Sequence, residues 1–340
     1  MIHFTHQQLG HNISENNIQG DVVSHETITK RVIDSWAIDD DTVFCHFLDQ
    51  GSVRSFSRRE FLLRANSFAQ AYSQHGVKPG HIVIILLGHH FDAYCSFAAA
   101  LLIGAIPSFL PLPSAKQDPE IYWETHTKLL RRIDARALVT HKASMEGRQI
   151  SNFPATAVIH IEDVLPQEMT VGALAVGEGD KIAFLQHSSG TTGLNKGVAL
   201  SHRTVLKNID TYARMIDLQA TDKIISWLPL YHDMGLITGF IMPMVHGIPF
   251  VSMDPFEWVM RPTLLLETLE SYQGTIAWMP NFAFHHIVNA AMPDDQWDLS
   301  SVRALINCSE PCKPQTMEEF NKRFSSMGLA RTALQSCYAM

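Results

Sequence analysis

The chain has 340 residues, which is enough for two ordinary domains or one large α/β domain and excludes a small scaffold that depends on disulfides or metals. Hydrophobic residues make up 46% and charged residues 18%, which excludes disorder across the whole chain. The net charge of -8 argues against binding to nucleic acid or to an anionic membrane through bulk charge. Any phosphate must therefore be held locally, by backbone amides and a few cations.

The cysteines favour a reducing compartment, and we expect the cytoplasm. They are odd in number, and no spacing among them matches a zinc ribbon or a CxxC redox pair: Cys45, Cys95, Cys308, Cys312 and Cys337. Residues 1–12 are polar and lack the apolar core of a signal peptide. The apolar stretch Tyr94–Pro113 approaches the roughly 20 residues of a membrane span, but a glycine and prolines interrupt its second half. We interpret it as a buried helix followed by a strand, and expect no membrane span.

Helical and strand patterns alternate along the first half of the chain. His81–Leu87 is a continuous apolar run bounded by turn residues, which is typical of a parallel strand covered on both faces. A helix, a strand, a second helix and a second strand are then predicted at Phe91–Gly104, Ile106–Leu110, Tyr122–Ala135 and Ala137–Thr140. This order predicts a parallel sheet with right-handed crossovers. The predicted class is α/β, with layered parallel or mixed sheets flanked by helices.

A boundary between two subdomains is predicted near residue 175. The stretch Lys142–Asp180 has weak periodicity and ends in a glycine-rich turn, Gly177–Asp180. We therefore expect a first α/β subdomain over residues 1–175 and a second over residues 176–340.

The second predicted subdomain opens with a strand and a loop of small and hydroxyl residues. Lys181–Gln186 is a short apolar strand that continues into His187 and then SSGTTGLNKG, residues 188–197. Glycines let amides approach phosphate oxygens, hydroxyls donate hydrogen bonds or reach a metal, and the lysine supplies charge. The alternative is an ordinary Ser/Gly-rich loop. A Walker loop is disfavoured, because it needs glycine at Asn195 and a hydroxyl residue at Gly197.

Further polar motifs follow apolar segments in the second half. They are SWLPLYHDMGL (226–236), PNFAF (280–284), NCSEP (307–311) and CYAM (337–340). Asn307–Pro311 is expected to follow a strand, Val302–Ile306, at the carboxyl end where open α/β sheets bind ligands. The alternative is a plain turn before a helix that starts near Pro314. Cys308 and Cys312 receive no role, because two thiols alone make a poor metal site.

In this order, the loop and the later motifs resemble the adenylate-forming superfamily, which includes acyl-CoA synthetases, amino-acid adenylation domains and fatty acyl-AMP ligases. LPLYHDMG together with PNFAF and a Glu-Pro pair is most similar to the fatty acyl-AMP ligase branch. The resemblance implies ATP-dependent activation of a fatty or other acyl acid to an acyl-adenylate, with release of pyrophosphate. It also implies Mg²⁺ and an acceptor thiol on a carrier protein or CoA.

The resemblance assigns site residues by motif. The β- and γ-phosphates would be held by Ser188, Ser189, Gly190, Thr191, Thr192, Gly193 and Lys196. Of these, Lys196, Thr191 and Thr192 would be the catalytic residues, and either threonine is a candidate Mg²⁺ ligand. The adenine would contact Ser309, Glu310, Pro311 and Tyr338. The acyl pocket would include His232, Asp233, Gly235, Trp278, Asn281 and Phe282.

His232 has two interpretations. A lone histidine in such a place is as often a satisfied core residue as a functional one. By the resemblance it would lie near the reacting carboxylate. No general base is required there, because a carboxylate above its pKa is already ionised.

The sequence departs from the family pattern at several positions. Asn195 replaces the usual proline, which predicts a less rigid loop, and Cys308 replaces a common glycine, which would narrow the space beside the adenine. Trp278 and Met279 are bulky where small residues are common. One hypothesis is a short or rerouted tunnel for a medium or unusual acyl group. The alternative is that both side chains pack in the core.

The last residues, Tyr338–Met340, stop where the family pattern continues with Ala-Glu. From this we expect an incomplete N-terminal domain without the C-terminal lid domain, and with an exposed sheet edge. Three alternatives to an acyl-AMP ligase stay open: an acyl-CoA synthetase, an inert binding or scaffold fragment, and an unrelated phosphate-binding transferase. The last would leave the ordered motifs unexplained.

Overall fold

The computed structural model describes residues 26–36, 40–113, 117–146, 156–168, 178–187 and 197–337. Helices and strands alternate in its first part: α1 Ile28–Ser35, β1 Val43–Asp49, β2 Ser52–Ser57, α2 Arg58–Gln74, β3 Ile82–Leu86, α3 Phe91–Leu102, β4 Ile106–Phe109, α4 Pro119–Arg132, β5 Ala135–Thr140 and β6 Ala157–His160. The second part begins with β7 Ile182–His187, β8 Gly197–Ser201, α5 His202–Met215, β9 Ile224–Ser226, α6 Asp233–Leu236, a π-helical turn Ile237–Ile241 and α7 Met242–His246. It continues with β10 Phe250–Met253, α8 Pro255–Met260, α9 Leu264–Tyr272, β11 Ile276–Pro280, α10 Asn281–Ala290, β12 Ala304–Cys308, α11 Pro314–Phe324 and β13 Leu334–Ser336. Single 3-10 turns lie at Ala143–Met145, Ile161–Asp163, Ser325–Met327 and Arg331–Ala333.

The predicted α/β class and the predicted βαβαβ order are confirmed. β3, β4, β5 and β6 form a parallel sheet in the order β4-β3-β5-β6, with α3 and α4 as the connections between its first three strands along the chain. The apolar stretch from residue 94 to residue 113 contains most of α3 and all of β4. Within the described ranges, the helices are all too short or too polar to cross a lipid bilayer.

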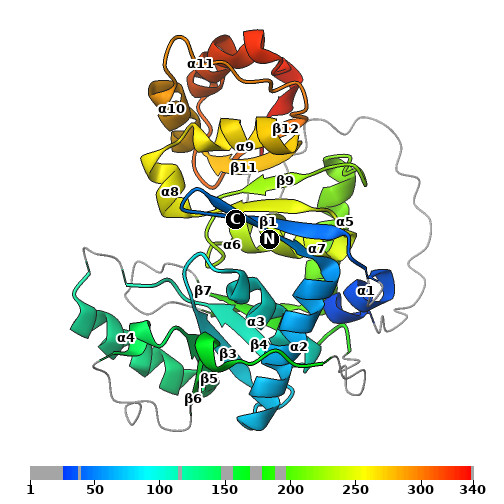
Figure 1. Cartoon of the computed structure of the whole chain (residues 1–340), viewed down its shortest axis with the longest axis vertical. Helices are drawn as coiled ribbons and strands as arrows, with labels where there is room; N and C mark the ends of the chain where they lie inside the picture. The colour runs from blue at the N-terminus through cyan, green and yellow to red at the C-terminus, as the bar shows by residue number, and fades with distance from the viewer. Residues whose placement is uncertain are drawn as a thin grey trace.

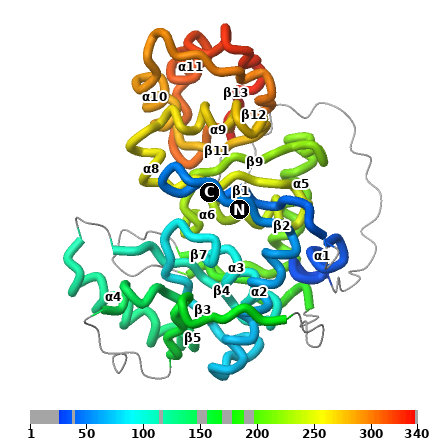
Figure 2. The backbone as a smooth tube through the Cα atoms, in the orientation of Figure 1, coloured from blue at the N-terminus to red at the C-terminus, as the bar shows by residue number. Residues whose placement is uncertain are grey.

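The larger sheet joins segments from both ends of the chain. Its order is β13-β12-β11-β9-β10-β1-β2, in which β2 runs antiparallel to β1 and the other neighbours are parallel. The blue strand β1 lies beside the later strands in Figure 2 and pairs with β10. This sheet therefore contains strands from both sides of residue 175, and the two-subdomain division stays a prediction.

Side chains on successive strand residues point to opposite faces, and in the smaller and the larger sheet both faces are covered. In the smaller sheet Ile84 and Leu86 pack with α4, whereas Val83 and Ile85 share a core with α2 and α3. In the larger sheet Ile224 belongs to that same central core, while Ile225 packs with α9, α10 and α11. The layers therefore alternate as helix, sheet, helix, sheet and helix (Figure 1).

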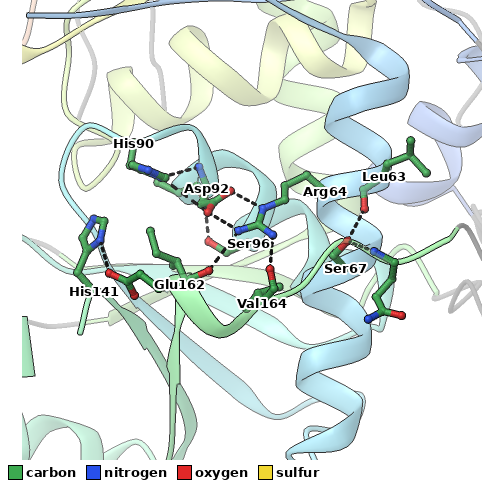
Figure 3. A network of polar contacts seen from close by, with 12 residues as sticks. Leu63, Arg64, Ser67, His90, Asp92, Ser96, His141, Glu162 and Val164 are labelled. Atoms are coloured by element: carbon green, nitrogen blue, oxygen red, sulfur yellow. Dashed lines mark hydrogen bonds and ion pairs between the residues drawn. The ribbon is translucent and has the colours of Figure 1, made fainter. Parts of the chain in front are cut away.

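An ion pair holds the two central helices together. In Figure 3 the guanidinium of Arg64 on α2 faces the carboxylate of Asp92 in the first turn of α3. Arg64 Nε and Nη2 donate to the two Asp92 oxygens at 2.7 and 2.6 Å, and Arg64 Nη1 donates to the Val164 carbonyl at 2.6 Å. The two side chains are 22% and 10% exposed, so the pair is largely shielded from water. It connects both helices to the segment that follows β6.

We predict that Asp92→Ala lowers the free energy of unfolding by about 3 kcal/mol, because it leaves a poorly solvated guanidinium without its counter-charge. Urea denaturation measures the loss. The double variant Arg64→Leu/Asp92→Ala should recover part of it, since no unpaired charge remains. A matched control is Glu124→Ala in the exposed Glu124–Lys128 pair, for which a much smaller loss is expected because water and salt screen the pair. Equal losses for the two single variants would contradict the prediction.

A buried histidine connects α1 to the start of α5. The Ile28 backbone N–H donates to His202 Nδ1 at 3.3 Å, so this nitrogen carries no proton and the ring is neutral. Burial lowers the pKa of His202 from 6.5 to about 4. Protonation would remove the acceptor and place a charge in the core.

The lowered pKa of His202 predicts a pH-dependent stability. The neutral ring is favoured by folding, so its contribution is full above pH 6.5 and is lost as the pH falls from 6.5 to 4. The free energy of unfolding should fall in this window by up to about 1.4 kcal/mol per pH unit from this group. Urea denaturation at several pH values should show a shallower dependence for His202→Gln than for the parent. An identical dependence in both proteins would disprove the assignment.

Candidate functional site

Strands β7 and β8 bring together the two ends of the predicted phosphate loop. They pair antiparallel, and His187 is the register partner of Gly197. The residue that precedes the loop and the residue that follows it are therefore neighbours. The loop residues themselves lie outside the described residues: Ser188, Ser189, Gly190, Thr191, Thr192, Gly193 and Lys196. Their assignments stay predictions.

His187 is fixed by a buried serine on β4. Ser108 Oγ donates its only hydrogen to the Leu185 carbonyl at 2.8 Å, so His187 Nδ1 donates to Ser108 Oγ at 2.7 Å. Burial lowers the pKa of His187, which keeps the ring neutral, and Nε2 is left as an acceptor. A Cβ at Gly197 would lie 3.3 Å from this Nε2, so the ring packs against the start of β8. Sequence reasoning gave Ser108 no role, although its place on an apolar strand is a signal of a buried hydroxyl partner.

A second hydrogen bond connects β7 to the segment between β9 and α6. Gln186 Nε2 donates to the Tyr231 carbonyl at 2.7 Å. Helix α6, which follows, needs glycine at position 235, because a Cβ there would lie 2.3 Å from the Pro229 oxygen and 2.8 Å from the Leu228 oxygen. The end of β7 and the YHD sequence are thus adjacent in the fold.

His232 and Asp233 are exposed at the start of α6, so the core interpretation of His232 does not hold. Partial desolvation lowers the pKa of His232, while Asp233 opposes the shift. The imidazole is therefore neutral at pH 7. A neutral ring can donate one hydrogen bond and accept another at this surface.

A buried amide network shapes the ends of β11 and β12. Asn307 Nδ2 and the Lys313 backbone N–H both donate to Asn281 Oδ1 at 3.0 Å, and Asn281 Nδ2 donates to Thr316 Oγ1 at 3.3 Å. Asn281 is 7% exposed and Asn307 is fully buried. The network fixes the angle at which α10 and α11 leave the sheet. The resemblance assigned Asn281 to the acyl pocket, but no sequence pattern indicated that Asn307 and Thr316 would be its hydrogen-bond partners.

The strand before the predicted adenine segment ends later than expected. It was predicted at Val302–Ile306, whereas β12 covers Ala304–Cys308. Asn307 and Cys308 are therefore buried strand residues and not part of the turn, because both fit the pairing of β12 with β11.

The turn after β12 is open to solvent. Ser309, Glu310 and Pro311 are exposed, and Ser309 has φ +68°. The Phe282 backbone N–H donates to Glu310 Oε1, so this turn also contacts the start of α10. Tyr338 lies outside the described residues.

Trp278 and Met279 pack in two different cores, on opposite faces of β11. The Trp278 indole Nε1–H donates to Tyr212 Oη on α5 at 2.7 Å. Core packing is the alternative that the sequence left open for both residues. The hypothesis of a short tunnel stays a prediction.

The carboxyl ends of parallel strands share one edge of a sheet. The segments after β9, β11 and β12 therefore lie along one edge of the larger sheet, and the Gln186 contact adds the end of β7 to it. This edge brings together the exposed residues His232, Asp233, Phe282, Ser309, Glu310 and Pro311. Among the residues with described positions, no three His, Cys, Asp or Glu side chains are grouped to hold a metal ion.

Comparison with known proteins gives several relatives. Long-chain-fatty-acid–AMP ligase FadD32 of Mycolicibacterium smegmatis is 30% identical over 332 residues, which cover 91% of this chain and 51% of that protein. Medium-chain-fatty-acid–[acyl-carrier-protein] ligase JamA of Moorena producens is 34% identical over 163 residues, covering 47% of this chain and 28% of JamA. The chain thus spans about half the length of FadD32.

Solved structures agree with the fold. A fatty acyl-adenylate ligase of Legionella pneumophila, in complex with acyl adenylate and pyrophosphate, has a TM-score of 0.81 and 25% identity, covering 92% of this chain and 55% of that one. The model of the family described as "AMP-binding enzyme" matches residues 30–340. This match includes the β7–β8 pair and the whole sheet edge described above, and the chain therefore belongs to the AMP-binding enzyme family.

Proposed function

We propose that this chain is the part of an acyl-AMP ligase that activates an acyl acid with ATP to an acyl-adenylate and releases pyrophosphate. The observation that carries the proposal is the Gln186–Tyr231 hydrogen bond. It brings the strand that precedes the SSGTTG loop against the YHD segment, so the proposed triphosphate and acyl regions share one edge. Family membership and the similarity to FadD32 support the proposal.

The proposed chemistry is a displacement at the α-phosphate of ATP. Two anions must approach each other, and negative charge grows on the departing pyrophosphate. Loop amides and hydroxyls would position the β- and γ-phosphates, and Lys196 would neutralise part of the charge. Because His187 and Gly197 are paired, the loop that carries these groups starts and ends at one place.

Mg²⁺ is proposed as the counter-ion of the triphosphate. Hydroxyl oxygens are hard ligands of the kind that Mg²⁺ accepts, so Thr191 or Thr192 is the candidate protein ligand. The bound ion would supply charge neutralisation at the phosphate oxygens. The neutral ring of His232 would contact the acyl carboxylate through a hydrogen bond.

The remaining site assignments are part of the same proposal. Adenine would contact Ser309, Glu310, Pro311 and Tyr338, and the acyl group would contact Asp233, Gly235, Trp278, Asn281 and Phe282. The exposed turn after β12 and the exposed Phe282 at the same edge support these roles.

We propose a carrier-protein thiol as the acceptor of the acyl group, because the relative JamA is named as a ligase for acyl carrier protein. CoA, which an acyl-CoA synthetase would use, is the second candidate. The cytoplasm is the proposed compartment, since all five cysteines are free. An inert binding or scaffold fragment remains the competing function, and pyrophosphate exchange separates it from a ligase.

We predict that Lys196→Ala lowers ATP–pyrophosphate exchange on the order of a hundredfold, because a positive charge at the developing oxyanions is removed. Exchange should be measured on this chain and on a version extended to the length of its relatives. Lys207→Ala on the exposed face of α5 is the matched control and should retain full exchange. Equal exchange in parent and Lys196→Ala would remove the phosphate role. Exchange in neither parent length would favour the inert fragment.

We predict that adenylation is fastest with medium or unusual acyl acids, because the bulky Trp278 would reduce the space of the proposed pocket. A ladder of acyl lengths in the exchange assay measures this preference. Trp278→Leu should shift the preference toward longer acids, and thermal unfolding should confirm that the variant is folded. A preference of the parent for the longest acids would contradict the short-tunnel hypothesis.

A further inference from the structure

Two cysteines face each other across the edge pair of strands, β12 and β13, which Figure 2 shows side by side. Asn307 is the register partner of Ser336, so Cys308 and Cys337 form the next pair along the two parallel strands. The Cys337 backbone N–H donates to the Asn307 carbonyl at 2.9 Å, which continues the pairing to this position. Neighbouring strands lie about 4.8 Å apart, and this spacing falls within the range of Cα–Cα distances that a disulfide spans. Both side chains enter the central core.

A directed chain of hydrogen bonds ends at the Cys337 sulfur. The Trp278 indole can only donate, so Tyr212 Oη accepts its hydrogen and keeps its own O–H for another acceptor. That acceptor is Cys337, which also contacts the Cys308 sulfur, whose own S–H donates to the Met279 carbonyl at 3.8 Å. The contact with Cys308, together with that from Tyr212, lowers the pKa of Cys337 against the effects of burial and of Asp233. The same contact raises the pKa of Cys308.

The other cysteines lack this arrangement. Burial raises the pKa of both Cys45 and Cys95, and both are fully buried. The Cys312 thiol donates to the Asn307 carbonyl at 3.4 Å, and burial raises its pKa too. Cys337 is 8% exposed, whereas Cys308 is fully buried, so an oxidant meets Cys337 before its partner. Because the thiolate is the reactive form, Cys337 is the favoured nucleophile.

We propose that Cys308 and Cys337 form an oxidative modification site, in which hydrogen peroxide converts the neighbouring thiols to a disulfide. The Cys337 thiolate attacks one peroxide oxygen; an S–O bond forms, the O–O bond breaks, and hydroxide leaves. This hydroxide takes the proton of the Cys308 thiol and becomes water. The Cys308 sulfur then attacks the Cys337 sulfur, so that the S–S bond forms, the S–O bond breaks and a second hydroxide leaves to be protonated by solvent. Two electrons pass from the two thiols to the peroxide.

The position of the pair predicts an effect on nucleotide binding, and this effect rests on the proposed function. Cys308 directly precedes Ser309, and Cys337 directly precedes Tyr338, so the disulfide joins the bases of both proposed adenine segments. Closing two neighbouring, non-bonded sulfurs to a bond of about 2.05 Å draws the strand ends together. We expect the adenine segments to move from their reduced positions and ATP to bind less tightly.

The disulfide itself is tested on the 340-residue chain by peroxide treatment, removal of the peroxide, unfolding in urea with iodoacetamide to alkylate the remaining thiols, and digestion without a reductant. Mass spectrometry should find the peptides of Cys308 and Cys337 linked, with Cys45 and Cys95 alkylated. The link should be absent in Cys308→Ser and in Cys337→Ser, and present in Cys312→Ser. Tyr212→Phe should form it several-fold more slowly, because one donor to the thiolate is lost.

Two results would overturn the site. One is a disulfide that uses Cys312 in place of either partner. The other is oxidation of Cys312, or over-oxidation of Cys337, while the parent protein forms no link. Mapping of the parent requires no variant, so a variant that fails to fold does not affect this result.

Calorimetry with ATP tests the effect on binding separately. The oxidised parent should bind ATP at least roughly threefold more weakly than the reduced parent, and dithiothreitol should restore the affinity. Cys308→Ser should keep its affinity after peroxide treatment. A disulfide without any change in affinity would refute the effect while leaving the site in place. Failure of the reduced parent to bind ATP would count against the proposed function, and the linked peptides would still report on the disulfide.

Discussion

The burial of the larger sheet on both faces is the constraint on which the rest of the structure depends. Alternate residues of β9 and β11 enter two different cores, so helices must cover both sides of the sheet. Parallel neighbours then place the carboxyl ends of these strands at one edge. The proposed site lies at this edge because the turns after the strands are the part of the sheet that the covering helices leave open.

Buried polar contacts decide how the turns at this edge are arranged. Ser108 fixes His187, Gln186 reaches Tyr231, and Asn281 accepts from Asn307. Each contact joins elements that are separated in the chain. A buried donor or acceptor without a partner costs about 1–3 kcal/mol, so each contact favours this arrangement of the elements. These contacts therefore also set the relative positions of the end of β7, the YHD segment and the start of α10.

Trp278 connects the core to the site edge. Its ring fills the central core, and its only polar atom fixes the orientation of the Tyr212 hydroxyl, which in turn reaches Cys337. A side chain that the sequence offers as a pocket residue thus also controls the chemistry of a thiol two strands away. The pair of cysteines gains its proposed reactivity from this packing, since neither cysteine has a sequence motif around it.

Much of the fold followed from apolar patterning. The run at residues 81–87 predicted β3, and the alternating segments after it predicted α3, β4, α4 and β5, because a strand buried on both faces is continuously apolar. The ordered motifs SSGTTG, LPLYHDMG and PNFAF carried the resemblance to the adenylate-forming superfamily, and the family match over residues 30–340 agrees with it. The pairing of β1 with β10 could not be predicted from the sequence, because no local pattern specifies a partner strand some 200 residues away in the chain.

The sequence by itself determined β3, β4 and β5 of the smaller sheet with the helices between them, and its motifs carried the resemblance to the family that the match over residues 30–340 confirms. Only the tertiary structure decided which side chains meet: the tautomer of His187, the buried position of Cys308 within β12, and the approach of Cys337 to it. The physical reason is that patterning reports whether a residue is buried, whereas strand register and the pairing of buried polar atoms depend on elements distant in the chain.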